Sequence, residues 1–327
     1  MIAQQVTYLA YAGGWQAVRR MPEPMAYRMF QWLADQQWRS RGRSVQRLEA
    51  NLARVLGPVD EAQLREVSRA GMRSYLRYWC DAFRLPSWDA ARIDSFEMRH
   101  IERLTEPIGR GRGVVVALPH MGNWDHAGAY ASRHVSPVTT VAEKLEPEAL
   151  FRAFLEFRES LGMTIYGLGD PGVFDGLADT LTGGGLVALL ADRDLSARGI
   201  EVQLFGEPAR FPAGPAALAV DTGAALHTAS LYWLGHNVAD ILPEIVPPAE
   251  GTRDERIRAA TQGIADVLEG AIRAHPADWH MLQRVFLADL DQRRLAERDA
   301  EEPAERDAAD RSEGDGSGSG RPEVAER

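Results

Sequence analysis

From residue 114 onward, short apolar runs alternate with segments whose apolar residues recur at helical spacing. The run Val114 to Leu118 is stopped by Pro119 and followed by Gly122, a pattern typical of a buried strand that ends in a turn. Further strands are predicted at 138–142, 163–166, 186–191, 226–233 and 240–246, and helices at 123–133, 146–161, 172–182 and 252–274. Strands that alternate with helices of this length predict an α/β fold with a central, mostly parallel β-sheet flanked by helices on both faces.

Before this region, the apolar residues follow a helical period. We predict helices over 3–20, 24–38, 44–56 and 60–84, and a short strand and helix over 97–110. The first two helices combine large apolar residues with aromatic and arginine side chains, which is typical of helices that lie in a membrane interface. We therefore interpret residues 1–43 as membrane-associating amphipathic helices. The alternative is that the same apolar faces pack on the protein core.

The C-terminal end has a different composition. From Asp291 onward apolar residues are sparse, charged residues are frequent, and glycine and serine dominate 314–320. Such a segment buries too little apolar surface to offset the entropy of ordering. The sequence thus predicts one folded domain over 1–290, followed by a disordered acidic tail over 291–327.

Composition and charge narrow the setting in which the protein works. The 327 residues are 45% hydrophobic, and Cys80 is the single cysteine, so a large core is available and no internal disulfide can form. The net charge of −10 is unevenly distributed, because the N-terminal residues 1–58 are basic, with eight arginines against three acidic residues. No secretion signal is evident, and no apolar run approaches the roughly 18 residues of a membrane span. We expect a peripheral protein on the cytoplasmic face of the plasma membrane, with an anionic membrane surface and no nucleic acid as partner.

The clearest candidate for chemistry is His120, which stands just beyond the strand 114–118. The carboxyl end of a parallel strand lies at the edge of the sheet where α/β proteins bind ligands. Asp125 follows one helical turn later, and a carboxylate there can orient the imidazole and stabilise the imidazolium that forms when the ring accepts a proton. A histidine with a purely structural role at this edge is the alternative.

These residues also carry a family resemblance. A hydrophobic strand followed by His120 and Asp125, in a His-x4-Asp pattern, resembles the signature of the glycerolipid acyltransferases. The longer stretch 113–125, with Gly122, Asn123 and Trp124, resembles the late acyltransferases of bacterial lipid A synthesis, and among them the actinobacterial phosphatidylinositol mannoside acyltransferases. A second landmark of that family, Asp-Arg-Asp at a strand end and then a proline-glycine helix start, is matched at 192–194 and 212–215. The resemblance covers about 5–290.

The resemblance implies a glycerolipid-acyltransferase-like fold and an acyl-CoA-dependent O-acyltransferase. The enzyme would move a long fatty acyl chain, with palmitoyl expected, from acyl-CoA to a mannose hydroxyl of a phosphatidylinositol mannoside with one or two mannoses. Acyl-CoA is then a co-substrate, and neither a cofactor nor a metal is needed. His120 would act as the general base. Its carboxylate partner is either Asp125, from the signature, or Glu201, which the resemblance to the actinobacterial subgroup favours.

Six further residues are predicted to contact substrates. The resemblance associates Arg158 with the edge of the active site, where a guanidinium can bind an acceptor phosphate or a phosphate of coenzyme A. The remaining predicted substrate-binding residues are Asn123, Trp124, Asp192, Arg193 and Asp194. For the last three, bracing the turn is an equally open interpretation.

Three other functions compete with this one. The first is an acyltransferase of the same family that acts on another glycolipid or on a lysophospholipid. The second is a metal-dependent hydrolase that uses His120, Asp125 and His126 as ligands. The third is a non-catalytic lipid-binding protein with the acyltransferase fold.

Overall fold

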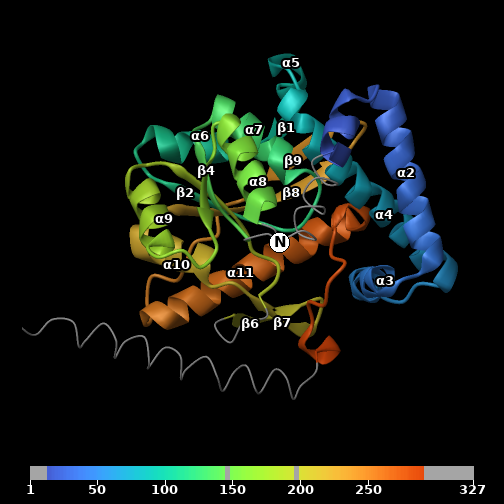
Figure 1. The fold of residues 1–327 in the computed structure, drawn as a ribbon. Helices are drawn as coiled ribbons and strands as arrows, with labels where there is room; N and C mark the ends of the chain where they lie inside the picture. The colour runs from blue at the N-terminus through green and yellow to red at the C-terminus, as the bar shows by residue number, and fades with distance from the viewer. Residues whose placement is uncertain (1–12, 144–147, 195–198, 291–327) are drawn as a thin grey trace, which may run out of the picture.

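A seven-stranded β-sheet forms the centre of the computed structural model, which describes residues 13–143, 148–194 and 199–290 (Figure 1). The strand order is β1-β9-β8-β2-β5-β3-β4. Strands β8, β2, β5, β3 and β4 run parallel, whereas β9 is antiparallel to β8 and carries β1 parallel to itself. The strands are β1 (Glu97–Arg99), β2 (Val114–Leu118), β3 (Val138–Ala142), β4 (Thr164–Gly167), β5 (Leu186–Leu190), β8 (Ala225–Trp233) and β9 (Asn237–Ile241). The predicted α/β fold with a mostly parallel sheet is confirmed.

Helices cover both faces of this sheet, which explains why β2 is apolar along its whole length. Successive side chains of a strand point to opposite faces. Val115 and Ala117 pack into one core with α9 (Val173–Thr182), α10 (Gly214–Thr222) and α11 (Arg253–Ala274). Val114 and Val116 pack into a second core on the other face. The helices of that face are α6 (Glu102–Gly109), α7 (Trp124–His134) and α8 (Glu148–Ser160), as Figure 1 shows.

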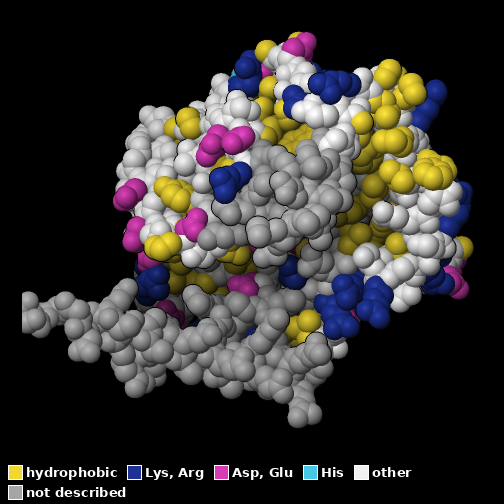
Figure 2. All heavy atoms as spheres, viewed as in Figure 1, with side chains coloured by type: hydrophobic (Ala, Val, Ile, Leu, Met, Phe, Trp, Pro, Cys, Tyr) yellow, Lys and Arg dark blue, Asp and Glu magenta, His cyan; other side chains and the backbone are white. Residues whose placement is uncertain are grey.

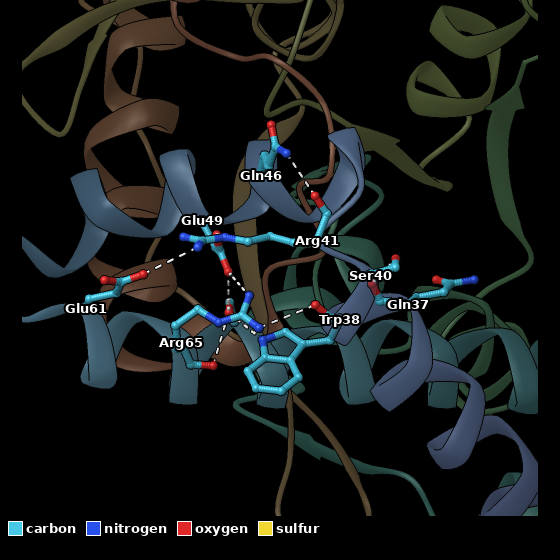
Figure 3. A network of polar contacts seen from close by, with 9 residues as sticks. Gln37, Trp38, Ser40, Arg41, Gln46, Glu49, Glu61 and Arg65 are labelled. Atoms are coloured by element: carbon cyan, nitrogen blue, oxygen red, sulfur yellow. Dashed lines mark hydrogen bonds and ion pairs between the residues drawn. The ribbon is translucent and has the colours of Figure 1, made fainter.

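The N-terminal helices pack with one another into a third core. They are α2 (Glu23–Ser40), α3 (Arg43–Leu56) and α4 (Glu61–Arg84), and residues 13–20 are also helical. Polar contacts join the three helices (Figure 3): Arg41 and Arg65 both bond Glu49, and the Arg65 guanidinium lies 3.8 Å from the centre of the Trp38 ring. Helix α4 begins with a capping box formed by Asp60 and Gln63, at the position that the sequence predicted.

Packing accounts for much of the apolar surface that was predicted to face a membrane. Val18 and Phe30 are buried in the third core, as the alternative of core packing expects for these two side chains, and membrane association of the N-terminal helices stays a prediction. Met25 and Trp32 remain exposed, at 57% and 58% of their surface. Figure 2 shows hydrophobic side chains gathered on the side of the molecule where α2 lies, with basic side chains near α3. The predicted segments 1–12 and 291–327 lie outside the described residues.

One strand differs from its predicted bounds, and several short elements complete the fold. Strand β9 spans Asn237–Ile241 rather than 240–246. The apolar residues after 200 form an antiparallel hairpin of β6 (Ile200–Leu204) and β7 (Glu207–Phe211), which is separate from the main sheet. Residues 279–286 connect the short 3-10 helices η2 (Pro276–Asp278) and η3 (Leu287–Asp289). Two further short elements, η1 (Leu85–Ser87) and α5 (Ala90–Ile93), follow α4. Within the described residues, no helix is both long and apolar enough to cross a membrane.

Candidate active site

His120 and Asp192 meet because β2 and β5 are neighbours in the sheet. The two strands pair in parallel register, with Leu118 opposite Leu190. Each strand is followed two residues later by one of these polar residues, so His120 and Asp192 stand level with each other at the carboxyl edge of the sheet. The backbone N–H of Ala191 donates to the carbonyl of Leu118 at 2.8 Å and extends the pairing toward them.

The two side chains form a close hydrogen-bonded pair. Nδ1 of His120 lies 2.5 Å from Oδ1 of Asp192, and the backbone N–H of His120 donates to Oδ2 at 2.9 Å. Asp192 is fully buried, whereas the His120 side chain is 33% exposed. Burial by itself would lower the pKa of His120 and raise that of Asp192, but the charge and hydrogen bond that each supplies reverse both effects. The pKa of His120 therefore lies above its ordinary value and that of Asp192 below.

Residues 278–280 hold this pair from the other side. They run antiparallel to 120–122: the N–H of Gly122 donates to the carbonyl of Asp278 at 2.9 Å, and the N–H of His280 donates to the carbonyl of His120 at 2.7 Å. Between them, the fully buried Trp279 donates from Nε1 to Oδ2 of Asp192 at 2.9 Å. Sequence reasoning had assigned no role to Trp279, because nothing in its local pattern links it to Asp192.

Gly122 belongs to the same tight arrangement. Its φ is +59°, a left-handed conformation that glycine adopts at little cost. A Cβ at this position would lie 2.6 Å from the backbone carbonyl carbon of Leu231 in the neighbouring strand β8. The turn after His120 therefore has room for glycine alone, which explains this residue of the signature stretch.

Asp125 is not the partner of His120 in the structure. Its carboxylate accepts from Nε of Arg158 at 2.8 Å and from the hydroxyl of Tyr78 at 3.0 Å, and it is buried. Burial lowers the pKa of Arg158, but the charges and hydrogen bonds of Asp125 and Tyr78 together raise it further, so this guanidinium stays charged. Asp125 lies in the first turn of α7, and its side chain meets α4 and α8 rather than folding back on the imidazole. The interpretation that Asp125 orients His120 is corrected accordingly.

Glu201 is also away from the pair. It lies on β6 in the separate hairpin, where Val202 and Leu204 are buried and Glu201 is exposed. Because side chains alternate along a strand, turning Val202 and Leu204 into the core points Glu201 the other way. The expectation that Glu201 touches His120 is therefore wrong for this structure: the carboxylate at Nδ1 is that of Asp192.

A cavity of about 320 Å³ lies beside His120, between the sheet and the α6–α8 layer. Strand side chains such as Val116, Leu118 and Leu231 form its floor. Small residues of α7 leave the space open: they are Ala127, Gly128 and Ala131. Met163, another lining residue, lies directly against Gly128, because a Cβ on Gly128 would lie 2.7 Å from its Cε. The histidine, acidic and arginine side chains of the lining are His120, Asp125, Glu143 and Arg158.

The other predicted site residues differ in their burial and in their distance from the cavity. Asn123 is buried and caps α7, accepting from the N–H of His126 at 2.9 Å, so it is structural rather than substrate-facing. Trp124 lines the cavity, and its ring centre lies 5.9 Å from that of His120. Arg193 and Asp194 are half-buried at the carboxyl edge of β5, and Asp194 is tied to β7 through its N–H to the carbonyl of Arg210. The predicted contacts of Arg158, Arg193 and Asp194 with substrate stay predictions.

The donor set does not suit the metal-dependent hydrolase. His126 is buried; its Nδ1 lies 3.1 Å from the Asn237 amide and its Nε2 lies 2.9 Å from the carbonyl of Ile93. Asp125 is bound by Arg158 and faces a different cavity from His126. Across the described ranges, no group of three or more His, Cys, Asp or Glu side chains is arranged to hold a metal ion.

Comparisons with known proteins point to one family of enzymes. The model of the bacterial lipid A biosynthesis acyltransferase family matches residues 2–288. A phosphatidylinositol mannoside acyltransferase of Mycolicibacterium smegmatis is 43% identical over 296 residues, which cover 89% of this chain and 95% of that protein. A phosphatidylinositol mannoside acyltransferase of Mycobacterium tuberculosis is 40% identical over 301 residues, which cover 90% and 93% of the two chains.

Proposed function

From the premise that this chain belongs to the bacterial lipid A biosynthesis acyltransferase family and is an acyltransferase, we propose that it acylates a mannose hydroxyl of a phosphatidylinositol mannoside. The acyl donor is a long-chain acyl-CoA, with palmitoyl-CoA as the expected example. The acceptors carry one or two mannoses. The observation that carries the proposal is a histidine–aspartate pair beside a deep apolar cavity. The names of the similar mycobacterial enzymes supply the acceptor class.

The chemistry follows from the geometry of His120. A neutral imidazole that donates its Nδ1 proton to Asp192 carries its lone pair on Nε2. In the proposed reaction Nε2 takes the proton of the mannose hydroxyl while the hydroxyl oxygen attacks the thioester carbonyl carbon. Asp192 stabilises the resulting imidazolium, as in other histidine–carboxylate pairs. The tetrahedral intermediate then collapses, the C–S bond breaks, and the thiolate of coenzyme A takes the proton from His120.

The apolar cavity suits the fatty acyl chain. Its walls are alkyl side chains from the strands and helix α7, and each methylene moved there from water contributes about 0.8 kcal/mol. With the chain in this cavity, the thioester carbonyl lies at its polar end, where His120 is among the lining groups. Arg158 stays fixed there by Asp125 and offers a positive charge toward the donor.

The decisive experiment is product analysis with purified full-length protein. Incubation with palmitoyl-CoA and phosphatidylinositol mannosides should yield a lipid heavier by one palmitoyl group, together with free coenzyme A. His120→Ala should lower the rate by about a hundredfold to ten-thousandfold while the protein stays folded. An active His120→Ala protein would remove this mechanism. Acylation of a different glycolipid or of a lysophospholipid instead would keep the enzyme class and replace the acceptor.

We place the protein, within the same proposal, on the cytoplasmic face of the plasma membrane as a peripheral enzyme. The acceptor is a lipid, and the exposed Met25 and Trp32 stand on the helix α2 that follows a basic segment. Trp32→Ser should weaken co-sedimentation with anionic vesicles, and added salt should weaken it further. Leu168→Ser is the matched control, because Leu168 is equally exposed at 58% but lies after β4, at the opposite edge of the sheet. Equal losses in the two variants would contradict this placement.

A further inference from the structure

A second cavity, of about 510 Å³, lies on the other side of α4 and α7 from the acyl cavity. Adjacent residues separate the two spaces: Tyr78 and Asp125 line the first, whereas Arg77 and His126 line the second. Its walls come from α2, α4, the segment around α5 and the β8–β9 turn, which Figure 1 shows around the β1 end of the sheet. The volume is within the range of small-molecule sites.

The wall of this second cavity is rich in guanidinium groups. Arg73, Arg77 and Arg92 line it, against a single acidic lining residue, Glu23. Arginine is the side chain best suited to phosphate, because its planar fork can donate two parallel hydrogen bonds to two phosphate oxygens. Aromatic side chains complete the wall, with Trp233 and Tyr27 among them. This combination differs from the acyl cavity, whose lining is mostly alkyl.

The arginines are incompletely neutralised by the protein. Arg73 shares the carboxylate of Asp35 with a second arginine, Arg69. Arg77 donates to the Ser74 hydroxyl at 3.2 Å and lies 3.5 Å from Asp278, while its guanidinium stacks 4.1 Å from the centre of the Trp233 ring. Burial lowers the pKa of Arg77, a sign that its charge has lost more hydration than its neighbours return.

Arg92 adds further donor capacity. The Nη2 nitrogen of Arg92 donates to Glu23 at 3.2 Å, and its buried Nε has no hydrogen-bond partner among the described residues. A buried N–H donor without an acceptor is costly unless a ligand supplies one, even though the rest of the Arg92 guanidinium is paired with Glu23. An anionic ligand with several oxygen acceptors would satisfy these groups together.

We propose that this second cavity binds a phosphate ester of a small polyol, with Arg73, Arg77 and Arg92 donating to the phosphate and the aromatic wall facing the polyol. The ligand is held apart from His120, on the far side of α4. Helix α2 contributes both to the cavity wall and to the exposed pair Met25 and Trp32. The same phosphate chemistry is available from an anionic lipid headgroup or from a soluble phosphate ester.

The test measures binding to the full-length protein in the absence of acyl-CoA, so its result is independent of acyl transfer. Calorimetric titration with myo-inositol 1-phosphate should show one saturable site, with inorganic phosphate binding more weakly at the same place. Co-sedimentation with phosphatidylinositol-containing vesicles, compared with pure phosphatidylcholine vesicles, distinguishes the lipid source. Binding in either arm that depends on Arg73 supports the site.

The chain offers a matched pair of variants. Arg69 and Arg73 both form two hydrogen bonds with Asp35 and are similarly exposed, at 38% and 37%, but only Arg73 lines the cavity. Arg73→Gln should weaken binding of myo-inositol 1-phosphate about tenfold or more, as expected when a charged hydrogen-bond donor is removed. Arg69→Gln should leave it within about twofold. Arg92→Gln is a second variant with an expected loss similar to that of Arg73→Gln.

Three outcomes would overturn the proposal. The first is the absence of saturable binding to the wild-type protein in both the soluble and the vesicle arms. The second is an equal loss in Arg73→Gln and Arg69→Gln, which would point to the shared ion pair with Asp35. The third is a loss of binding in His120→Ala, which would place the phosphate in the acyl-transfer site.

Discussion

Asp125 and Asp192 are both buried carboxylates near the carboxyl edge of the sheet, and they have different partners. Asp192 bonds the imidazole and the backbone of His120 and accepts from Trp279. Asp125, only five residues after His120, bonds Arg158 and Tyr78. Proximity along the chain therefore did not select the carboxylate partner of His120; the pairing of neighbouring strands did. A helix turn carries Asp125 to the α4–α8 side, whereas strand register carries Asp192 to His120.

The largest difference between the two carboxylates is expected in turnover. Asp192→Asn should lower kcat by roughly a hundredfold to ten-thousandfold, because an amide cannot stabilise the imidazolium and favours the wrong tautomer. Asp125→Asn should act mainly on stability, since it leaves the partly buried Arg158 without its carboxylate, at a cost of about 3 kcal/mol. Rates should be measured in single turnovers, with melting curves for both proteins. A folded Asp125→Asn protein as inactive as Asp192→Asn would reverse the assignment.

Trp279→Phe tests whether Trp279 affects catalysis through its hydrogen bond to Asp192. The ring volume is nearly kept, but the Nε1–H donor to Oδ2 is lost. Because a hydrogen bond to a charged group is worth about 1.5–3 kcal/mol, kcat should fall about tenfold to a hundredfold with KM almost unchanged. Trp38→Phe is the control, since it loses a 3.0 Å bond to Ser68 away from the site. A fall in melting temperature without a change in kcat would make Trp279 a packing residue.

The pH dependence of kcat/KM follows from the direction of the His120 shift. The base must be neutral to accept a proton, and its pKa lies above the ordinary value because Asp192 outweighs burial. Activity should therefore rise with pH through a midpoint above about 6.5, and be lost as the pH falls below it. In Asp192→Asn the residual activity should show a lower midpoint, because burial remains while the carboxylate charge is gone. An unchanged midpoint would separate Asp192 from the titration of His120.

The smallest effect is expected at Glu201. This exposed side chain on β6 faces away from the core, so Glu201→Gln should change kcat by less than about twofold and the free energy of unfolding by less than about 0.5 kcal/mol. Glu207→Gln on the neighbouring strand is a useful comparison, because Glu207 bonds Arg54 at 2.9 Å. A large kinetic loss in Glu201→Gln alone would mean that the hairpin approaches His120 during the reaction.

Much of the architecture was determined by local sequence. The apolar run 114–118, stopped by Pro119, was enough to place β2 and to put His120 at the edge of the sheet. The strand-and-helix alternation after it gave the fold class, because a strand buried on both faces is apolar throughout. Asp192 was also recognised as a strand-end residue, but its role was left open between binding substrate and bracing the turn, and its pairing with His120 was not predicted. The alternation in 200–204, with Val202 and Leu204 apolar, was a signal that Glu201 faces outward, but the sequence analysis did not use it.

Only the tertiary structure decided which of these residues meet. Strand β5 lies beside β2 although β3 and β4 come between them in the chain, and the sequence carries no record of that strand order. Residues 278–280 follow α11 and lie more than 150 residues beyond His120 in the sequence. They bring Trp279 into contact with Asp192. Local patterns fix which face of an element is apolar, because periodicity depends on neighbours in the chain. Hydrogen-bond partners across the sheet depend instead on packing among elements far apart in sequence, so the His120–Asp192 pair became visible only in the folded molecule.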